Sequence, residues 1–118
     1  MSEPQTFHAE GLAREHGSKG KLYLEFLRQP SLSAGLYVLP TRHQDPQTPH
    51  TEDEVYVVLK GRGQIALDGQ DRPVIPGSIV YVPAQMEHRF HSIEEDLQVL
   101  VLFAPAEGTH TGAVAPNA

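Results

Sequence analysis

Short apolar runs, broken at close intervals by Gly, Pro and acidic residues, extend over most of this sequence. The runs are rich in Val, Leu, Ile and Tyr, and β-branched and aromatic residues of this kind favour strands. Eight strands are predicted, at residues 21–27, 35–39, 54–59, 64–67, 72–75, 78–82, 87–92 and 97–103. Because no long amphipathic helix or internal repeat competes with this pattern, we expect an all-β sandwich or barrel.

Turn signals separate the predicted strands. Residues 61–63 read Gly-Arg-Gly and predict a turn that makes a hairpin of the strands on either side. Asp-Gly at 68–69 and Pro-Gly at 76–77 predict two further turns. The acidic residues 94–96 predict another turn, just before the most apolar strand.

The length of 118 residues is enough for one hydrophobic core and too small for two. Ten Pro and ten Gly suit many short strands better than long helices. We predict a polar N-terminal segment at 1–20, a single barrel at 21–105 and a disordered tail at 106–118.

Net charge and composition exclude several classes of protein. A net charge of −6 argues against nucleic acid as a partner. No apolar run is long enough to span a membrane, and the polar residues 1–10 carry no signal peptide. The absence of Cys excludes a disulfide framework and agrees with a reducing compartment. We therefore expect a cytoplasmic protein that binds neither nucleic acid nor membranes.

Three residues have the spacing of a metal site. His50 and Glu54 are four apart, so in an extended segment both side chains point to one face. His88 follows the loop after Pro83 and adds a third ligand from a different strand. Two His and one carboxylate suit a divalent transition metal, whether Fe, Mn, Ni, Co or Zn, and leave coordination positions open.

The same region resembles the two sequence motifs of the cupin superfamily. The first motif ends in His, three or four residues, Glu, six residues and Gly, and this chain matches it with His50, Glu54 and Gly61. The second motif runs Gly, five residues, Pro-x-Gly, two residues, His, three residues, Asn. Here it begins at Gly77 and includes the Pro and the His, but Gln85 replaces its second Gly and Ser92 replaces its Asn. Fifteen residues separate the motifs, as in compact bacterial cupins.

This resemblance covers residues 35–105 and implies a cupin barrel, that is, a double-stranded β-helix or jelly roll. It also implies a metal held by His50, Glu54 and His88. The family's first motif has one more ligand, a His at the position where this chain has Thr48. Thr48, the neighbouring Gln47 or a water can take its place. The alternative is a pocket without metal, in which the two His are hydrogen-bonded side chains.

Strand alternation predicts which side chains near His50, Glu54 and His88 face the interior of the barrel and which face outward. Tyr56 and Val58 share a face with Glu54, and Phe90 shares one with His88, so all should line the interior. Tyr56 is a core aromatic in the simplest interpretation and a proton donor in the other. Arg89 and His91 have the opposite parity, so their side chains should point outward. We also expect Glu52 and Asp53 to be solvated. The remaining histidines are predicted at the surface: His8, His16, His43 and His110.

Three interpretations fit these features. The first is a metal-dependent enzyme that acts on a small molecule, and we rank oxygenase chemistry ahead of isomerase or lyase chemistry. The second is a non-catalytic module that binds a small molecule in the same barrel, and a structural dimer with a vestigial pocket is a third. Both faces of 97–103 are apolar, and one of them needs a partner, so we expect a homodimer.

Overall fold

The computed structural model describes residues 3–19, 22–46 and 48–109, and within these ranges the chain forms one helix and six strands. Every pairing between these strands is antiparallel. The elements are α1 (Ala9–Lys19), β1 (Tyr23–Gln29), β2 (Leu32–Leu39), β3 (Asp53–Leu67), β4 (Gln70–Val74), β5 (Ile79–Val82) and β6 (His88–Ala104).

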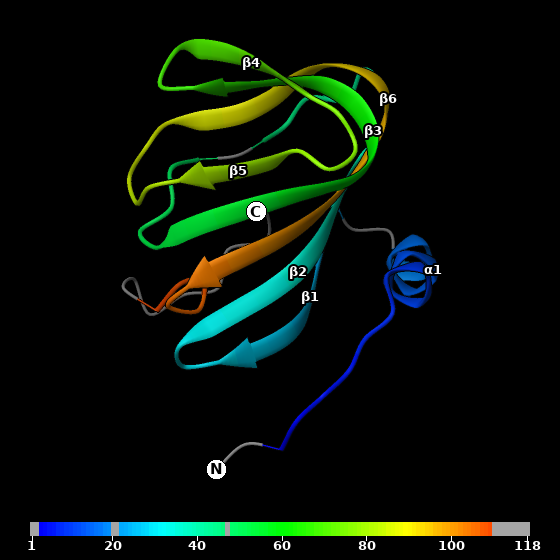
Figure 1. Ribbon diagram of the computed structural model, residues 1–118, viewed down its shortest axis with the longest axis vertical. Coiled ribbons are helices and arrows are strands. Elements are labelled where there is room, and N and C mark those ends of the chain that lie inside the picture. Colours follow the sequence, from blue (N-terminus) through cyan, green and yellow to red (C-terminus); the bar gives the residue numbers. More distant parts are fainter. Residues whose placement is uncertain (1–2, 20–21, 47, 110–118) are drawn as a thin grey trace.

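The six strands form a single curled sheet. Its order is β1-β2-β6-β3-β4, and β5 pairs with β3 outside this path. Figure 1 shows β3 and β6 running through both halves of the molecule, with β1 and β2 at one end of the sheet and β4 at the other. This is a jelly-roll barrel whose edges do not close on each other, and it confirms the predicted all-β class and single barrel.

The strands β3 and β6 are each longer than predicted, because two expected turns do not reverse the chain. β3 continues through 61–63 and β6 through 94–96, so eight predicted strands become six. Gly61 has a φ of +93°, and the β3–β6 pairing shifts register around it, which bends the strand without turning it back. A Cβ at Gly61 would lie 2.2 Å from the backbone oxygen of Asp96, so these two predicted turns are bends at a close crossing.

The predicted Asp-Gly turn is confirmed. Asp68 and Gly69 both have positive φ, at 49° and 81°, and they join β3 to β4 as a tight hairpin. The Pro-Gly pair at 76–77 lies between β4 and β5, where Gly77 has a φ of +94°. Glycine suits these positions because it adopts this conformation without a steric penalty.

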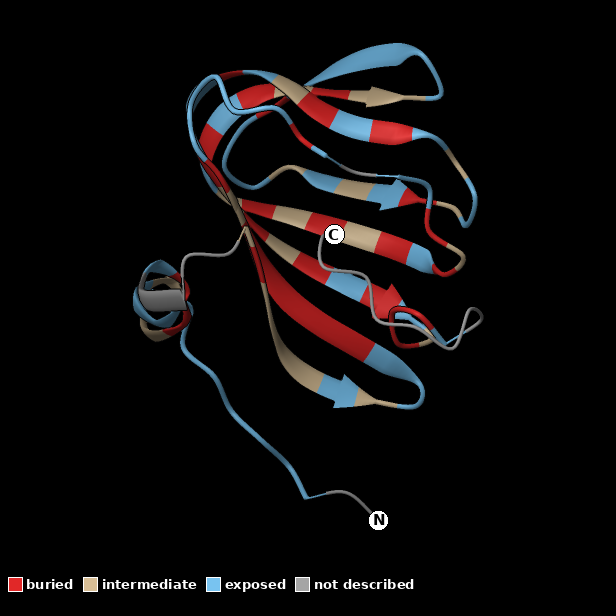
Figure 2. Ribbon diagram, turned by 180° about the vertical axis from the view of Figure 1, so that it is seen from behind, coloured by how far each residue is buried: buried red, intermediate tan, exposed pale blue. Residues whose placement is uncertain are grey.

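Buried residues alternate with less buried ones along much of the two long strands (Figure 2). Glu54, Tyr56 and Val58 of β3 are buried, and so is Phe90 of β6, as their parity predicts. Burial of one such aromatic side chain contributes roughly 1.5–3 kcal/mol. The largest buried aromatic side chains are Tyr37, Tyr56, Phe90 and Phe103.

Two residues of β6 face outward, as predicted. Arg89 is exposed, and the half-buried His91 places Nε2 2.8 Å from Oδ1 of Asp71. They therefore lie on the opposite side of the strand from His88, which is buried.

The N-terminal segment, which the sequence predicted only as polar, contains the helix α1. Leu12 and His16, one turn apart on its surface, are both buried, and the helix contacts β1 and β2. Nε2 of His16 lies at hydrogen-bond distance from the carbonyl oxygen of Leu22. The prediction of a surface position for His16 is therefore wrong, whereas His8 and His43 are exposed as predicted and His110 lies outside the described residues.

The chain folds back onto the barrel after β6. Ala106, Glu107 and Gly108 are buried, although the sequence placed them in a disordered tail. The backbone N–H of Ala106 donates to the carbonyl oxygen of Pro30 at 3.4 Å. The folded part of the chain thus extends past the predicted boundary at 105, and residues 110–118 of the predicted tail lie outside the described residues.

Candidate metal centre

The structure brings the three predicted ligands together at one end of the barrel interior. His50 lies just before β3, Glu54 is the second residue of β3, and His88 is the first residue of β6. Each offers a ligand atom, and these atoms all lie within 4.8 Å of one another. The exposed fractions of the three residues are 7%, 1% and 4%, so the group is shielded from solvent.

Each ring nitrogen of His88 lies close to an oxygen atom of another residue. Nδ1 lies 2.9 Å from the carbonyl oxygen of Met86, which can only accept, so Nδ1 carries the proton. Nε2 lies 3.3 Å from Oε1 of Glu54. Burial lowers the pKa of His88, but the Glu54 carboxylate, the Met86 carbonyl and Asp45 outweigh that effect, and the pKa is raised.

His50 is fixed by packing and by its backbone. Its ring meets that of Phe103 edge to face at a centroid distance of 5.0 Å, and the ring of His88 lies 5.4 Å away. The carbonyl oxygen of His50 accepts a hydrogen bond from the N–H of Gln85 at 2.7 Å. This bond joins the loop of the second motif to the segment of the first, and so couples the positions of the two histidines.

The two substituted positions of the second motif both have a left-handed backbone conformation. Gln85 and Ser92 stand where the cupin motif has Gly and Asn, and their φ values are +69° and +50°. Gly and Asn are the residues that adopt this left-handed conformation most readily. Gln85 and Ser92 therefore carry backbone strain at two positions whose conformation Gly or Asn would adopt more readily.

Thr48 is exposed, whereas the three candidate ligands are buried. Its hydroxyl is therefore not part of the buried group. The other candidate for the missing family ligand, Gln47, lies outside the described residues.

The buried carboxylates near this group fit a cation. Both oxygens of Glu54 and both oxygens of Glu107 are buried and have no hydrogen-bond partner. Burying a carboxylate without hydrogen bonds or a counter-charge costs several kcal/mol. A divalent metal at His50, Glu54 and His88 would compensate this charge, and imidazole and carboxylate are ligands that such metals accept.

Glu107 also lies at this site, and no pattern in the sequence predicts it there. Oε2 of Glu107 lies 3.7 Å from Nδ1 of His50, and both side chains are buried. Burial raises the pKa of Glu107 to about 8, and the carboxylates of Glu54, Glu25 and Glu52 add to the rise. The residue follows the last strand in a stretch of Ala, Gly and Thr, which has no periodicity that would place it.

Glu52 is also buried, at 2% exposed, so its prediction as a solvated acid is wrong. Oε1 of Glu52 accepts a hydrogen bond from the N–H of Gly108 at 3.0 Å, and Oε2 accepts one from the Thr51 hydroxyl. Its carboxylate therefore ties the C-terminal segment to the start of β3. Asp53 is exposed as predicted and accepts a hydrogen bond from the N–H of Ala84 at 2.9 Å.

Two tyrosines line the interior beside the ligands. The ring of Tyr56 lies 6.1 Å from that of His88 and 4.9 Å from that of Phe90, so it packs as a core aromatic. Tyr23 passes over Gly35, where a Cβ would lie 2.2 Å from its ring. Its buried hydroxyl has no hydrogen-bond partner, and burial, with Glu107 next in importance, raises its pKa.

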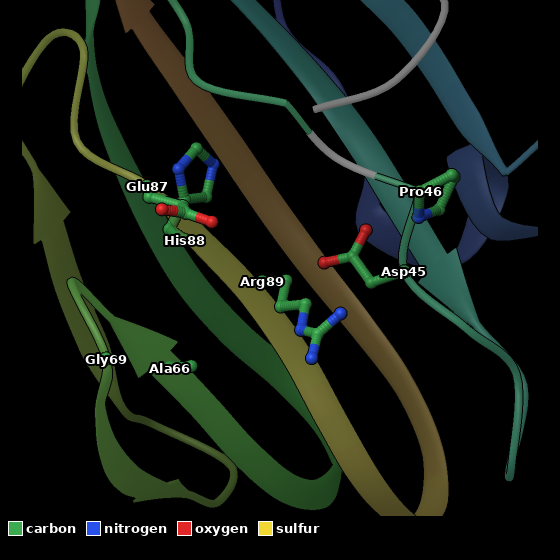
Figure 3. A pocket seen from close by; sticks show the side chains of 7 residues that line it. All are labelled: Asp45, Pro46, Ala66, Gly69, Glu87, His88 and Arg89. Carbon is green, nitrogen blue, oxygen red and sulfur yellow. The ribbon is translucent and has the colours of Figure 1, made fainter.

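A pocket of about 460 Å³ reaches His88 from outside the barrel. Figure 3 shows the side chains of Asp45, Glu87 and Arg89 around it, together with that of His88. Asp45 is held in place because Oδ2 accepts the N–H of Phe90 at 2.8 Å and Oδ1 accepts the hydroxyl of Tyr37. Charged groups of both signs therefore surround an opening next to the candidate ligand His88.

Comparison with known proteins identifies the family. Residues 35–104 match the model of the cupin domain, and the chain belongs to the cupin family. This confirms the resemblance of the two motifs. The matched range includes His50, Glu54 and His88 and ends before Glu107.

One relative matches nearly the whole chain. SCO3923 of Streptomyces coelicolor is 45% identical over 103 residues, which are 87% of this chain and 98% of that protein. Among solved structures, TT1209 from Thermus thermophilus has a TM-score of 0.73, covering 87% of this chain and 99% of its own, at 19% identity. At that identity the similarity shows a shared fold.

Two enzymes match shorter stretches. Glucose-6-phosphate isomerase of Pyrococcus abyssi is 37% identical over 62 residues, and acireductone dioxygenase of Bacillus thuringiensis is 33% identical over 66 residues. These stretches cover 48% and 50% of this chain, but only 33% and 38% of the two enzymes. The similarity is therefore confined to one cupin-sized region of each enzyme.

Within the described residues, no helix is long and apolar enough to cross a membrane.

Proposed function

We propose that this protein is a metal-dependent cupin enzyme that acts on a small molecule. The observation that carries the proposal is the convergence of His50, Glu54 and His88 inside the barrel. Two imidazoles and one carboxylate bind a transition metal and leave coordination positions for a substrate. The buried oxygens of Glu54, which have no hydrogen-bond partner, support the proposal, since a divalent metal would compensate the charge of this carboxylate.

The metal we propose is divalent, and Fe, Mn, Ni, Co and Zn all suit the ligand set. When bound, it would supply Lewis acidity toward an oxygen-bearing substrate, or activation of dioxygen if it is iron. The chain's own residues hold and shield the site. Tyr56, Phe90 and Phe103 form its apolar wall, and the pocket beside His88 offers a small molecule a route to it.

Oxygenase chemistry is the first candidate, supported by the local similarity to acireductone dioxygenase. Isomerase chemistry is the second, supported by the local similarity to glucose-6-phosphate isomerase. The same barrel can host either reaction, because activity depends on the site and not on the fold.

Untagged protein loaded with each of the five metals would be tested for oxygen uptake with small diketones, thiols and phenols. The same samples would be tested for aldose–ketose interconversion of sugar phosphates. Metal-dependent oxygen uptake supports the oxygenase, and metal-dependent interconversion supports the isomerase. Binding of a small molecule without turnover across both panels would instead indicate a non-catalytic binding module.

We also propose that the protein is a homodimer. Ile79, Tyr81 and Leu102 are exposed, at 73%, 58% and 38%. Tyr81 and Leu102 both pair with Val55, so they lie side by side on the outer face of β5, β3 and β6. A second copy is the occupant we propose, because a two-fold contact covers the same apolar face on both copies at once.

A further inference from the structure

The segment after β6 is fixed to the barrel at several points. The N–H of Glu107 donates to the hydroxyl oxygen of Ser33 at 2.9 Å, and the N–H of Gly108 donates to Glu52 at 3.0 Å. The guanidinium of Arg28 donates to the carbonyl oxygen of Glu107 at 2.7 Å. The backbone at Glu107 is therefore held from three directions, and its side chain has a defined place.

That side chain points to His50. Oε2 of Glu107 lies 3.7 Å from Nδ1 of His50, and the Glu107 side chain is only 1% exposed. Neither of its carboxylate oxygens has a hydrogen-bond partner, so packing alone does not account for a carboxylate at this position. A shift of about 0.8 Å would bring the two atoms to hydrogen-bond length.

His88 shows how the other histidine of the site is oriented. Its Nδ1 donates to the Met86 carbonyl, and this leaves Nε2 facing Glu54. Histidines that bind metal through one nitrogen usually donate the other N–H to a carbonyl or a carboxylate, which fixes the tautomer and the ring orientation. At His50 the group opposite Nδ1 is the carboxylate of Glu107.

We propose that Glu107 is the positioning residue of His50: it accepts the Nδ1–H and keeps Nε2 unprotonated and aimed at the metal. The inference rests on the proposed metal site and adds to it a residue that lies beyond the matched cupin domain, which ends at 104. The segment that carries Glu107 thereby completes the metal site from outside the family's motifs.

The first test reads the tautomer of His50 in protein stripped of metal, by nitrogen NMR of the imidazole at about pH 9, where Glu107 is a carboxylate. The parent and Glu107→Gln should both show His50 protonated at Nδ1, since a Gln side-chain oxygen can still accept that proton. Glu107→Leu should show a mixture of tautomers. An unchanged tautomer in Glu107→Leu would overturn the proposal. A His50→Gln spectrum assigns the signals, and Glu94→Gln, a change at an exposed carboxylate, is the matched control.

The second test measures affinity for Zn²⁺ and Co²⁺ by calorimetry. Glu107→Leu should bind about 10- to 100-fold more weakly than the parent, and Glu107→Gln should fall between the two. Equal affinity in all three proteins would overturn the proposal. Since Glu107 is not a ligand here, the visible spectrum of the Co²⁺ protein should keep its shape in both variants, and a change of coordination would overturn it too.

The two tests separate this inference from the proposed function. If the parent binds no metal, the proposed metal site fails, and the tautomer measurement still decides whether Glu107 orients His50. If the parent binds metal and the variants match it in both tests, the metal site stands and the role of Glu107 is wrong. Circular dichroism of each variant shows whether it is folded, and Glu107→Gln keeps the shape of the original side chain.

Discussion

Nε2 of His88 lies 3.3 Å from Oε1 of Glu54, although the two residues are not neighbours in the strand pairing. In the β3–β6 pairing Glu54 stands opposite Phe103, and His88 stands opposite Leu67. The two side chains meet across the interior because both long strands bend and bring their ends together. The geometry of the candidate site therefore depends on the curl of the sheet as much as on the ligands themselves.

Replacing Glu54 by Gln should stabilise the metal-free protein at about pH 9, well above the usual pKa of a free imidazole. The change removes a buried charge whose oxygens have no hydrogen-bond partner. We expect the free energy of unfolding to rise by about 1–3 kcal/mol, measured with urea in the presence of a chelator. A lower free energy of unfolding for Glu54→Gln would mean that the charge is already compensated by the protein.

The stability of the metal-free protein should fall as pH rises from about 5 to about 8. Burial raises the pKa of Glu107 to about 8, so in this range the folded state keeps a proton that the unfolded state has lost. The raised pKa of His88 acts in the same direction, since its stabilising proton is lost as pH increases. Urea unfolding at a series of pH values measures the slope.

In the variant Glu107→Gln that slope should become shallower, because one of the two titrating groups is gone. A parent protein whose stability rises between pH 5 and pH 8 would contradict the prediction. Glu94→Gln, at an exposed carboxylate, should leave the slope unchanged.

Gln85→Gly should leave the metal site intact and raise the free energy of unfolding by up to about 1 kcal/mol. Gln85 has a φ of +69°, where a Cβ is strained and glycine is not. Part of this gain is offset by the larger conformational freedom of glycine in the unfolded chain. Gln85→Val, which puts a β-branched residue in the same conformation, should lower the free energy of unfolding by more than about 1 kcal/mol. Thermal unfolding of the parent and the two variants measures these differences.

Tyr81→Glu should dissociate the homodimer. The change places a charge on the apolar outer face of β5, β3 and β6, where it would be buried by the second copy. Light scattering after size exclusion at micromolar concentration should give the mass of a dimer for the parent and of a monomer for Tyr81→Glu. Leu32→Glu, an exposed change at the first residue of β2, is the control and should remain dimeric. A monomeric parent would refute the dimer.

The sequence alone predicted the class of fold and the convergence of His50, Glu54 and His88, because both depend on local rules. Alternation placed Glu54, Tyr56 and Val58 on one face, and the motif spacing selected His88 from seven histidines. The turns at 61–63 and 94–96 were wrong for a physical reason. A Gly-rich stretch or an acidic run can bend a strand as readily as reverse it, and only the pairing of the two long strands decides which occurs.

Glu107 and Glu52 were missed because their burial depends on contacts distant in sequence. The N–H groups of Glu107 and Gly108 bind Ser33 and Glu52, and these bonds bring a polar segment with no strand pattern into the core. No periodicity in residues 105–109 signals such docking. Acidic residues in Gly- and Thr-rich segments are usually solvated, so the sequence favoured the wrong interpretation.

The most direct test of the metal site is the metal content of untagged protein, with binding of added Fe²⁺, Mn²⁺, Ni²⁺, Co²⁺ and Zn²⁺ measured by calorimetry. The parent should bind one metal ion per chain. His50→Ala and His88→Ala should lose it, and His91→Ala, which alters the outward-facing histidine of the same strand as His88, should retain it. Equal binding by His50→Ala, His88→Ala and the parent, or no binding by the parent to any of the five metals, would contradict the proposed site.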